Sequence, residues 1–502
     1  MATRKKIKPV GGLVPARDRQ IVKESLGKFG LRNMGTYAFE TNLERALPDL
    51  FDGMKPVQRR VAYAMLHTAN TEFVKSARIV GDTLGKYHPH GDSSVYGAMV
   101  TMSHFPTPVL LGKGNWGNMV DNAAAYRYTN ARLSQFGRTF FDPDYIHREV
   151  TSFVPNYDDK DVEPISLPAQ LPYVLMAPNE GTGVGITGKL PAFTAESIIE
   201  VLTRLLQGEK LQAADFAKTL KFANKWGGVL LNTPESKAQW LRMFKEPEAN
   251  LKFVSDMQVD TAKKRIIISD WPIGSNPMKF IESVRAMKET LRAQTSKGSS
   301  TVTIICKPDY NLPQFEAYVK RVHRLTQKTW AVKMNVTVRK AQVNDGVVDY
   351  VNKVEAMSVP QMLVAWLRMR IDLELRSLAY RQRKQEQAIA YSELLIFVSS
   401  KLDVLFKALK TSDPDAYLVK ALKLTPEQAK QVLDLPTRRW SRMDQADLKT
   451  KLKEQQAFLR QLQAWTKAPR KKVLAGLPAI LDAIKKDRAF KVQVAEQKLK
   501  MV

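Results

Sequence analysis

Three short patterns in the sequence combine residue types and spacings that could do chemistry. Two are glycine-rich loops of the form G-x-G-x-x-G, at residues 112–117 and 183–188. Such loops cradle phosphate where a strand leads into a helix. The first loop opens no apolar helix, and the second runs into Lys189, Leu190 and Pro191, which supply neither a metal-binding hydroxyl nor a helix N-terminus. Because both loops lack this context, we predict that neither binds ATP.

The third pattern is the pair His88-Pro-His90. Two histidines at this spacing could hold a metal ion, but the candidate third ligands, His67 and His104, stand at no recognisable spacing. The single cysteine, Cys306, excludes a cysteine-based zinc site and an internal disulfide. We therefore favour two histidines that contact phosphate or backbone, with a metal pair as the alternative, and we expect no metal site on this chain.

A dense run of motifs surrounds the histidine pair. The run comprises Arg45-Ala-Leu-Pro-Asp49, Asp52-Gly-Met-Lys-Pro-Val-Gln-Arg-Arg60, Lys75-Ser-Ala-Arg78, Gly85-Lys-Tyr-His-Pro-His-Gly-Asp-Ser93, the loop at 112–117 and Ala123-Ala-Ala-Tyr-Arg127-Tyr128-Thr129. Together and in this order, these motifs resemble the breakage-reunion subunit of type IIA DNA topoisomerases. That family includes the A subunit of DNA gyrase, its counterpart in topoisomerase IV and the medium subunit of T-even phage topoisomerases. The resemblance covers most of residues 31–490.

The resemblance implies a catalytic set. Family members cleave DNA with a tyrosine that attacks a backbone phosphate and stays attached as a 5′-phosphotyrosyl ester, and Tyr128 matches this nucleophile. Tyr126 is a neighbouring phenol at a position where members carry small or apolar residues. Further residues match positions in the pocket of the scissile phosphate, where they would offset transition-state charge or handle protons: Arg127, Arg45, His88 and His90.

A second implied set binds DNA. The stretch from Lys75 to about Ser103 resembles the helix-turn-helix of the family's winged-helix domain, whose second helix would begin near Asp92 and rest on DNA. Phosphate contacts position a protein on DNA without reading its sequence. The residues assigned to DNA contact are Lys55, Arg59, Arg60, Lys75, Arg78, Lys86, Ser93 and Thr182. Thr182 stands where the family commonly has an isoleucine wedge, so bending of the DNA here would be weaker unless Val184 substitutes.

The elements that must position these residues indicate an α+β protein that is mainly helical. The predicted organisation is a basic N-terminal arm (1–30), a winged-helix catalytic domain (31–150), an α+β tower domain (151–345), a long antiparallel coiled coil with a small globular dimer gate (346–490) and a basic tail (491–502). In the tower, β-branched runs at 265–269 and 301–305 predict strands.

The coiled coil is predicted from the absence of helix breakers. No Gly or Pro occurs between Gln361 and Lys410, and apolar residues recur there at helical spacing. This pattern predicts one rod of about 75 Å, which ends at the Thr-Ser-Asp-Pro break at 411–414. A second apolar seam at 448–462 predicts its antiparallel partner.

Composition limits the remaining function classes. The 502 residues are 44% hydrophobic and 25% charged, which is typical of soluble globular protein, and no apolar run approaches the ~20 residues of a membrane span. The net charge of +28 attracts polyanions such as nucleic acid without choosing among them. The surplus gathers in 1–30, with 8 basic and 2 acidic residues, and in 449–502, with 14 and 4.

The resemblance also implies partners. These are double-stranded DNA, a second copy of the chain in a homodimer, and a gyrase B-like subunit that completes a heterotetramer and holds ATP and Mg²⁺. Because no DNA-wrapping domain fits after the coiled coil, relaxation and decatenation are expected. Gyrase-type negative supercoiling is one alternative, and a non-catalytic winged-helix DNA-binding scaffold is another. The expected location is the cytoplasm of a bacterial cell or of a phage-infected host, and the layout most resembles a large-phage enzyme.

Overall fold

The computed structural model describes residues 24–104, 107–118, 120–177, 179–223, 228–295, 300–344, 347–436 and 445–486, and the side chains of 340–351 lie outside this description. Most of the predicted basic arm and all of the predicted basic tail therefore fall outside the described residues. Within the described part, no helix is both long and apolar enough to cross a membrane.

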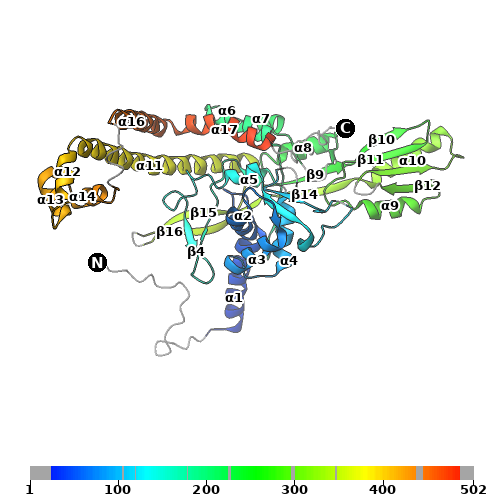
Figure 1. Cartoon of the computed structure of the whole chain (residues 1–502). Coiled ribbons are helices and arrows are strands. Elements are labelled where there is room, and N and C mark those ends of the chain that lie inside the picture. The colour runs from blue at the N-terminus through cyan, green and yellow to red at the C-terminus, as the bar shows by residue number, and fades with distance from the viewer. Residues whose placement is uncertain are drawn as a thin grey trace.

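A central body carries three projections (Figure 1). Helix α11 (Val359–Ser399) extends to one side, a four-stranded sheet lies on the other, and helix α1 (Leu26–Thr41) projects from the body. Helix α1 starts at Ser25, whose side chain accepts a hydrogen bond from the backbone N–H of Lys28, and it buries none of its residues. The predicted arm at 1–30 thus already includes the first turn of a helix.

Three helices and a small sheet carry the motif run. They are α2 (Pro56–Thr68), α3 (Ser76–Lys86) and α4 (Asp92–Met102), with β1 (Val74–Lys75), β3 (Asn130–Leu133) and β2 (Leu110–Lys113) in an antiparallel sheet of that order. Helix α2 begins where Pro56 fixes φ at the first helical position and the Gln58 side chain accepts from the backbone N–H of Lys55. The bounds of α3 and α4 confirm the two helices predicted between Lys75 and Ser103.

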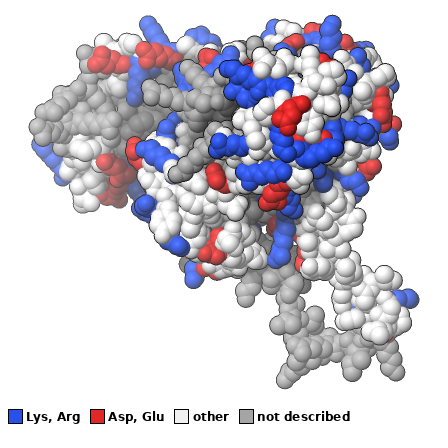
Figure 2. All heavy atoms as spheres, turned by 90° about the vertical axis from the view of Figure 1, so that its right-hand side faces the viewer, with Lys and Arg blue, Asp and Glu red and all other residues white. Residues whose placement is uncertain are grey.

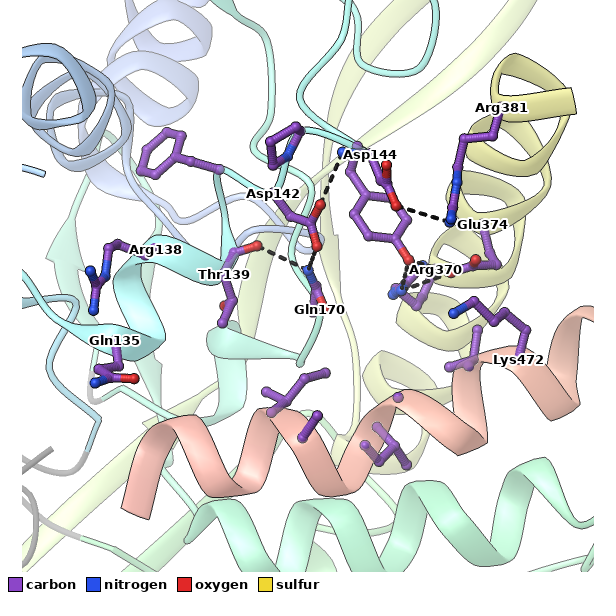
Figure 3. Close-up of a pocket in the computed structure, with 18 of the residues that line it drawn as sticks. Gln135, Arg138, Thr139, Asp142, Asp144, Gln170, Arg370, Glu374, Arg381 and Lys472 are labelled. Atoms are coloured by element: carbon purple, nitrogen blue, oxygen red, sulfur yellow. Dashed lines mark hydrogen bonds and ion pairs between the residues drawn. The ribbon is translucent and has the colours of Figure 1, made fainter. Parts of the chain in front are cut away.

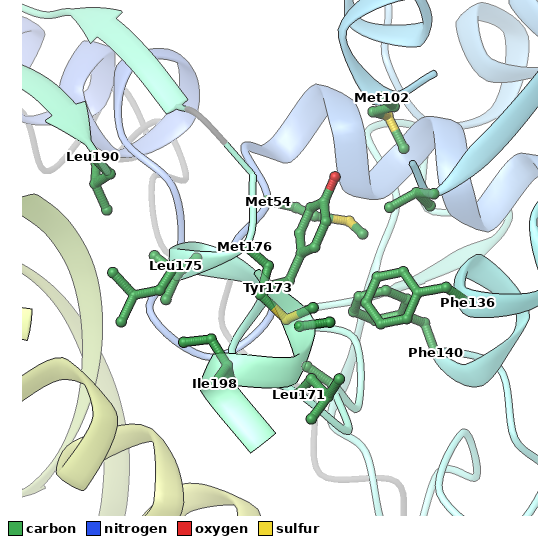
Figure 4. Close-up of a cluster of buried hydrophobic side chains, with 14 of the residues drawn as sticks. Met54, Met102, Phe136, Phe140, Leu171, Tyr173, Leu175, Met176, Leu190 and Ile198 are labelled. Atoms are coloured by element: carbon green, nitrogen blue, oxygen red, sulfur yellow. The ribbon is translucent and has the colours of Figure 1, made fainter. Parts of the chain in front are cut away.

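One continuous apolar core joins this helical part to the residues that follow it (Figure 4). Tyr173, in the short helix η4 (Tyr173–Leu175), lies with its ring centroid 5.8 Å from that of Phe136 and 5.9 Å from that of Phe140. Phe136 belongs to α5 (Gln135–Thr139), and Phe140 caps it. Each fully buried ring of this kind stabilises the fold by roughly 1.5–3 kcal/mol, so the motif helices are held as part of a larger rigid body.

A five-stranded sheet follows in the body. Its strands, in order, are β6 (Asn179–Thr182), β7 (Thr187–Leu190), β14 (Lys328–Lys333), β9 (Glu248–Val254) and β8 (Val229–Leu230), and α6 (Ala195–Leu206), α7 (Ala213–Thr219) and α8 (Pro234–Arg242) lie between β7 and β9 in the chain. Two hairpins join the body nearby, β4 (Phe153–Pro155) with β5 (Val162–Pro164) and β15 (Asn335–Asn344) with β16 (Val347–Ala356). The β15–β16 hairpin spans the predicted domain border at 345.

The four-stranded sheet has a core of its own. Its strands, in order, are β10 (Asp256–Asp260), β11 (Arg265–Ser269), β13 (Val302–Cys306) and β12 (Thr290–Thr295), with α9 (Pro277–Arg285) and α10 (Leu312–Leu325). Alternate residues Ile266 and Ile268 of β11 are fully buried with Phe315 of α10, as period-two strand geometry requires. Both predicted strands are confirmed.

The rod predicted over 361–410 is shorter than expected. Helix α11 ends at Ser399 after 41 residues, about 60 Å. The hydroxyls of Ser399 and Ser400 donate to the carbonyls of Ile396 and Phe397, a local alternative to continued helix. The chain then folds into α12 (Leu402–Ala408), α13 (Pro414–Leu422) and α14 (Pro426–Leu433), which share an apolar cluster with the end of α11.

Helix α16 (Gln445–Lys467) runs back along α11 in the opposite direction. The Ser392 hydroxyl donates to the Gln455 side chain, whereas Gln382, nearer the start of α11, donates to Thr466. The predicted antiparallel arrangement of the two helices is therefore observed, and Leu462 of α16 is buried. The sequence interpretation extended the coiled coil to 490, but α17 (Pro469–Lys486) returns to the body and packs on α5, α6 and α11.

Tyr145 of the body contacts a buried ion pair within α11, beside a cavity of about 640 Å³ (Figure 3). Arg370 and Glu374 of α11 are 3.0 Å apart and almost fully buried, and the Tyr145 hydroxyl donates to Glu374 at 2.8 Å. Side chains of α17 form another wall of the cavity. The Tyr145 contact is one of several links between α11 and the body, together with the hydrogen bonds of Trp366 to Phe51 and of Ser377 to Asp144.

Candidate active site

The motif that contains two tyrosines forms a single turn, η3 (Tyr126–Tyr128), immediately before β3. The next residue, Thr129, is fully buried and donates its hydroxyl to Ser76 at 2.8 Å, and the same hydroxyl oxygen lies 3.0 Å from that of Tyr96. The backbone N–H of Ser76 donates to the Thr129 carbonyl at 3.0 Å. The turn is therefore fastened to the first residue of α3 and to the middle of α4.

The two tyrosines of the turn differ in exposure and in pKa. Tyr128 is 66% exposed, and the Arg127 guanidinium lies 4.9 Å from its ring centroid. The hydrogen bond from Arg127, followed by its charge, lowers the pKa of Tyr128. Tyr126 instead donates to Asp92 at 2.8 Å, and this hydrogen bond raises the pKa of Tyr126. Because the phenolate is the reactive form of a tyrosine, Tyr128 is the more readily activated of the two phenols.

The glycine-rich loop at 112–117 packs beneath this turn. A Cβ added to Gly112 would lie 2.2 Å from Nε1 of Trp116, and one added to Gly114, where φ is +101°, would lie 3.3 Å from the Tyr128 carbonyl oxygen. The Trp116 ring in turn lies 5.6 Å from the Tyr96 ring. Close packing against Trp116 and against the tyrosine turn therefore accounts for Gly112 and Gly114, whereas a Cβ on Gly117 would lie 2.9 Å from the backbone nitrogen of Ala123.

A second group of residues, here called the histidine pocket, contains Arg45, Arg60, His88, His90 and Glu163. His88 is buried just after α3, and its ring centroid lies 4.5 Å from that of His90. Burial, then the charges of Arg60, His90 and Arg45, lowers the pKa of His88 to about 4. His88 is therefore a neutral imidazole at pH 7, able to accept a proton at one nitrogen and to donate from the other.

Arg60 and Glu163 form the firmest contact of the histidine pocket. Both oxygens of Glu163, on β5, accept from Arg60, on α2, at 2.7 Å each. The remaining Arg60 nitrogen, Nη1, lies 3.1 Å from Nδ1 of His88. The predicted phosphate contact Arg60 is thus also a neighbour of the predicted catalytic histidine.

Arg59 has a different environment from the one expected of a phosphate contact. Its Nε donates to the fully buried Asp52 at 2.5 Å, and its Nη2 donates to the same carboxylate at 3.1 Å. Asp52 also accepts from the backbone N–H groups of Met54 and Leu167. This geometry gives Arg59 the structural role of fixing the turn before α2.

Lys55 and Thr182 lie at the β6–β7 hairpin. Lys55 donates through Nζ to the Glu180 carbonyl at 2.7 Å, and burial lowers the pKa of Lys55. The tip of the hairpin is held by Asn42, whose side chain exchanges two hydrogen bonds with the backbone of Val184. Thr182 is exposed and Val184 is half-buried, so the predicted wedge position is presented on an anchored loop.

The other predicted DNA contacts line α3 and α4. All four are exposed: Lys75, Arg78, Lys86 and Ser93. Basic side chains are also numerous beyond the two chain ends. Seen from the end of the four-stranded sheet, Lys and Arg form several patches on the upper part of the surface, with Asp and Glu among them (Figure 2). Exposed basic residues of α9, the segment that follows it, β12 and α10 are Lys279, Arg285, Lys288, Arg292, Lys320, Arg321 and Arg324.

The tyrosine turn and the histidine pocket lie apart in the sequence, and different charged side chains affect the pKa values of Tyr128 and His88. Among the described residues, Arg127 is the only charged side chain that shifts the pKa of Tyr128, whereas the pKa of His88 responds to Arg60, His90 and Arg45. In the same described part of the chain, no group of three or more His, Cys, Asp or Glu side chains is placed to hold a metal ion.

Two residues of the site were missed by sequence reasoning. The sequence predicted Asp92 only as the start of a helix, and it assigned no role to Glu163. Their partners, Tyr126 and Arg60, lie 34 and 103 positions away. The cluster of acidic residues around Glu163 in a basic chain is the one weak signal that the sequence offers.

Comparison with known proteins identifies the family. Residues 45–475 match the family model of the DNA gyrase/topoisomerase IV A subunit. The chain is 29% identical over 465 residues to the A subunit of DNA topoisomerase 4 from Neisseria gonorrhoeae, covering 86% of this chain and 59% of that protein. It is 28% identical over 477 residues to the protein of the same name from Staphylococcus aureus (strain N315), covering 90% of this chain and 56% of that protein.

The chain therefore belongs to the family of DNA gyrase and topoisomerase IV A subunits. It spans less than two thirds of the length of the curated relatives that it matches.

Proposed function

We propose that this chain is the DNA-cleaving and rejoining subunit of a type IIA topoisomerase, with Tyr128 as the nucleophile. The observation that carries the proposal is the contrast within η3: Tyr128 is exposed with a lowered pKa, and Tyr126 is bonded to Asp92 with a raised pKa. Family membership supports the reaction class, and the location of the turn beside α3 and α4 supports access to DNA.

The proposed step is a transesterification. The phenolate oxygen of Tyr128 forms a bond to phosphorus as the bond from phosphorus to the 3′-oxygen breaks, which leaves a 5′-phosphotyrosyl ester and a 3′-hydroxyl once that oxygen takes a proton. Rejoining is the reverse attack by the 3′-hydroxyl, and it needs no nucleotide because the phosphodiester is exchanged for another ester. Arg127 supports this chemistry by favouring the phenolate and offsetting charge on the phosphorus oxygens.

The histidine pocket is proposed to complete the site across a homodimer. Tyr128 takes no charge effect from the pocket among the described residues of its own chain, and it is exposed, so it can reach the pocket of a second copy. There, Arg45 would contact the phosphate, and the neutral His88 with His90 would share proton transfer.

Helix α4 and its neighbours are proposed to hold the DNA. Exposed Lys75, Arg78 and Lys86 would neutralise phosphates, and Ser93 at the start of α4 would add a hydrogen bond. We propose that α3, α4 and the sheet β1–β3–β2 form the winged helix of the family. The anchored β6–β7 hairpin would place Thr182 or Val184 against the bases, where a small side chain gives a weak wedge.

ATP and Mg²⁺ are assigned to a gyrase B-like partner. We assign no step of the proposed reaction to a metal on this chain. We propose a heterotetramer of two copies of each subunit, acting in the cytoplasm of a bacterium or of a phage-infected host.

Strand passage could give different topological products. Relaxation and decatenation are the proposed outcomes. If incubation with relaxed plasmid produces negative supercoils, gyrase-type supercoiling is the activity instead. The non-catalytic scaffold, the other alternative, would bind DNA and form no covalent link.

The test of the proposed function is a trapped protein–DNA adduct. The full chain is incubated with Mg²⁺, end-labelled duplex and a gyrase B-like subunit, and the reaction is stopped with detergent. Wild type should form the adduct, Tyr128→Phe should form none, and Tyr126→Phe should retain it. An adduct with Tyr128→Phe, or its loss only with Tyr126→Phe, would reject Tyr128, and no adduct with wild type would favour the scaffold.

A further inference from the structure

A carboxylate outside the proposed catalytic set controls the geometry of the histidine pocket. Glu163 lies on β5, and its two oxygens accept from Nε and Nη2 of Arg60 at 2.7 Å each. The two side chains are mostly buried, with 11% and 21% exposure. A bidentate pair of this kind fixes the plane of the guanidinium as well as its distance, so Arg60 has one orientation in the pocket.

In that orientation, the third nitrogen of the Arg60 guanidinium faces His88. Nη1 of Arg60 lies 3.1 Å from Nδ1 of His88. A guanidinium can only donate hydrogen bonds, so Nδ1 must be the acceptor and carries no proton. In the neutral ring the proton is then on Nε2. The tautomer of His88 is thus decided by an arginine that a carboxylate holds in place.

Two other groups that face His88, Arg45 and His90, affect its charge, whereas the hydrogen bond that selects its tautomer comes from Arg60. Arg45, Arg60 and His90 all lower its pKa, together with burial. Within the ring contact with His90, the centroids lie 4.5 Å apart, and the backbone N–H of His90 donates to the His88 carbonyl. Among these described contacts, only Arg60 bonds to a ring nitrogen of His88.

We infer that Glu163 is a positioning residue for DNA cleavage, which holds Arg60 so that His88 keeps its proton on Nε2. The inference rests on the proposed function for its effect on rate, but its effect on the His88 tautomer is independent of any reaction. When Glu163 is lost, Arg60 is free to turn, and His88 populates both tautomers, of which one lacks the N–H at Nε2.

The experiment compares the full chain with the variants Glu163→Gln, Glu163→Ala and Arg60→Lys. Asp161→Asn is the matched control, because Asp161 is an exposed acid two residues away on the same segment. The tautomer is read by ¹⁵N NMR of histidine-labelled protein at pH 7.5, where His88→Gln assigns the signal among the six histidines. Single-turnover cleavage and duplex affinity are measured with the gyrase B-like subunit.

The expected results distinguish a positioning role of Glu163 from a general effect on folding. Glu163→Ala and Arg60→Lys should show both His88 tautomers and cleave at least about tenfold more slowly, a modest share of what general acid–base catalysis gives. The duplex affinity of Glu163→Ala, which removes no predicted DNA contact, should stay within about twofold of wild type. Glu163→Gln keeps one acceptor for Arg60, so its loss should be smaller. Asp161→Asn should match wild type in every measurement.

The inference is overturned if His88 keeps its proton on Nε2 in folded Glu163→Ala, or if that variant cleaves at the wild-type rate. If Glu163→Ala fails to fold, Glu163→Gln carries the test, and a wild-type tautomer and rate in that variant overturn the inference. If wild type itself forms no adduct, the proposed function fails, whereas the tautomer measurement still decides the role of Glu163.

Discussion

The tyrosine turn and the histidine pocket hold their functional side chains in opposite ways. Tyr128 is exposed and has Arg127 as its charged neighbour, whereas His88 is buried against Arg60, which Glu163 fixes. In the turn, the backbone is fastened by Thr129 and the reactive side chain is left free. In the pocket, the side chains themselves are fastened. The difference fits the roles proposed for them, in which Tyr128 must reach a phosphate and the histidine pocket must bind it.

The largest effect in this comparison is expected from Arg127→Ala. Without the guanidinium, the pKa of Tyr128 returns toward its ordinary value and the phosphate loses a donor, so adduct formation in a single turnover should fall by about 10²–10³-fold. Arg127→Lys should lose less, because it keeps the charge but not the fork. Wild-type cleavage by Arg127→Ala would show that the turn needs no charge beside its tyrosine.

Arg59→Ala is expected to act on stability. It leaves Asp52 buried without its partner, a change that typically lowers the free energy of unfolding by about 3–5 kcal/mol. Urea unfolding at pH 7.5 measures this loss, and Arg127→Ala, at an exposed site, should unfold at the wild-type urea concentration. If Arg59→Ala and wild type are equally stable, Arg59 is again a candidate for contact with a DNA phosphate.

A smaller effect is expected from pH. Because the pKa of His88 is lowered to about 4 from the ordinary value near 6.5, the unfolded chain binds more protons between these values. The free energy of unfolding should therefore fall as pH drops from about 6.5 to about 4, with no contribution from His88 above pH 7. At pH 5 the loss is on the order of 1 kcal/mol after allowance for solvent screening.

Urea unfolding at pH 7.5 and pH 5 checks this expectation. His88→Gln should lose less stability than wild type between the two values, because its side chain does not titrate. Identical losses would mean that His88 has its ordinary pKa in the folded protein.

Local signals explain what the sequence could predict. Helices α3 and α4 and the strands β11 and β13 were found because caps, breakers and apolar periods act over a few residues. The motif run led to Tyr128 and to the family. Helix α11 was predicted too long because the hydroxyls of Ser399 and Ser400 compete with helix continuation, and Ser is otherwise tolerated in helices.

Long-range contacts explain what the sequence could not predict. Whether an arginine contacts phosphate or a carboxylate depends on what the fold brings next to it. Arg59 and Arg60 are adjacent on α2, yet one pairs with Asp52 in the core and the other with Glu163 from β5. No pattern within α2 distinguishes them, since the partner of Arg60 lies 103 positions away.

Mapping the DNA-linked residue tests the central claim most directly. The adduct formed with Mg²⁺ and the gyrase B-like subunit is digested with nuclease and protease, and the modified peptide is sequenced by mass spectrometry. The account predicts a nucleotide on Tyr128, in the peptide that contains residues 126–129. A nucleotide on Tyr126, or on any residue outside this turn, would contradict it.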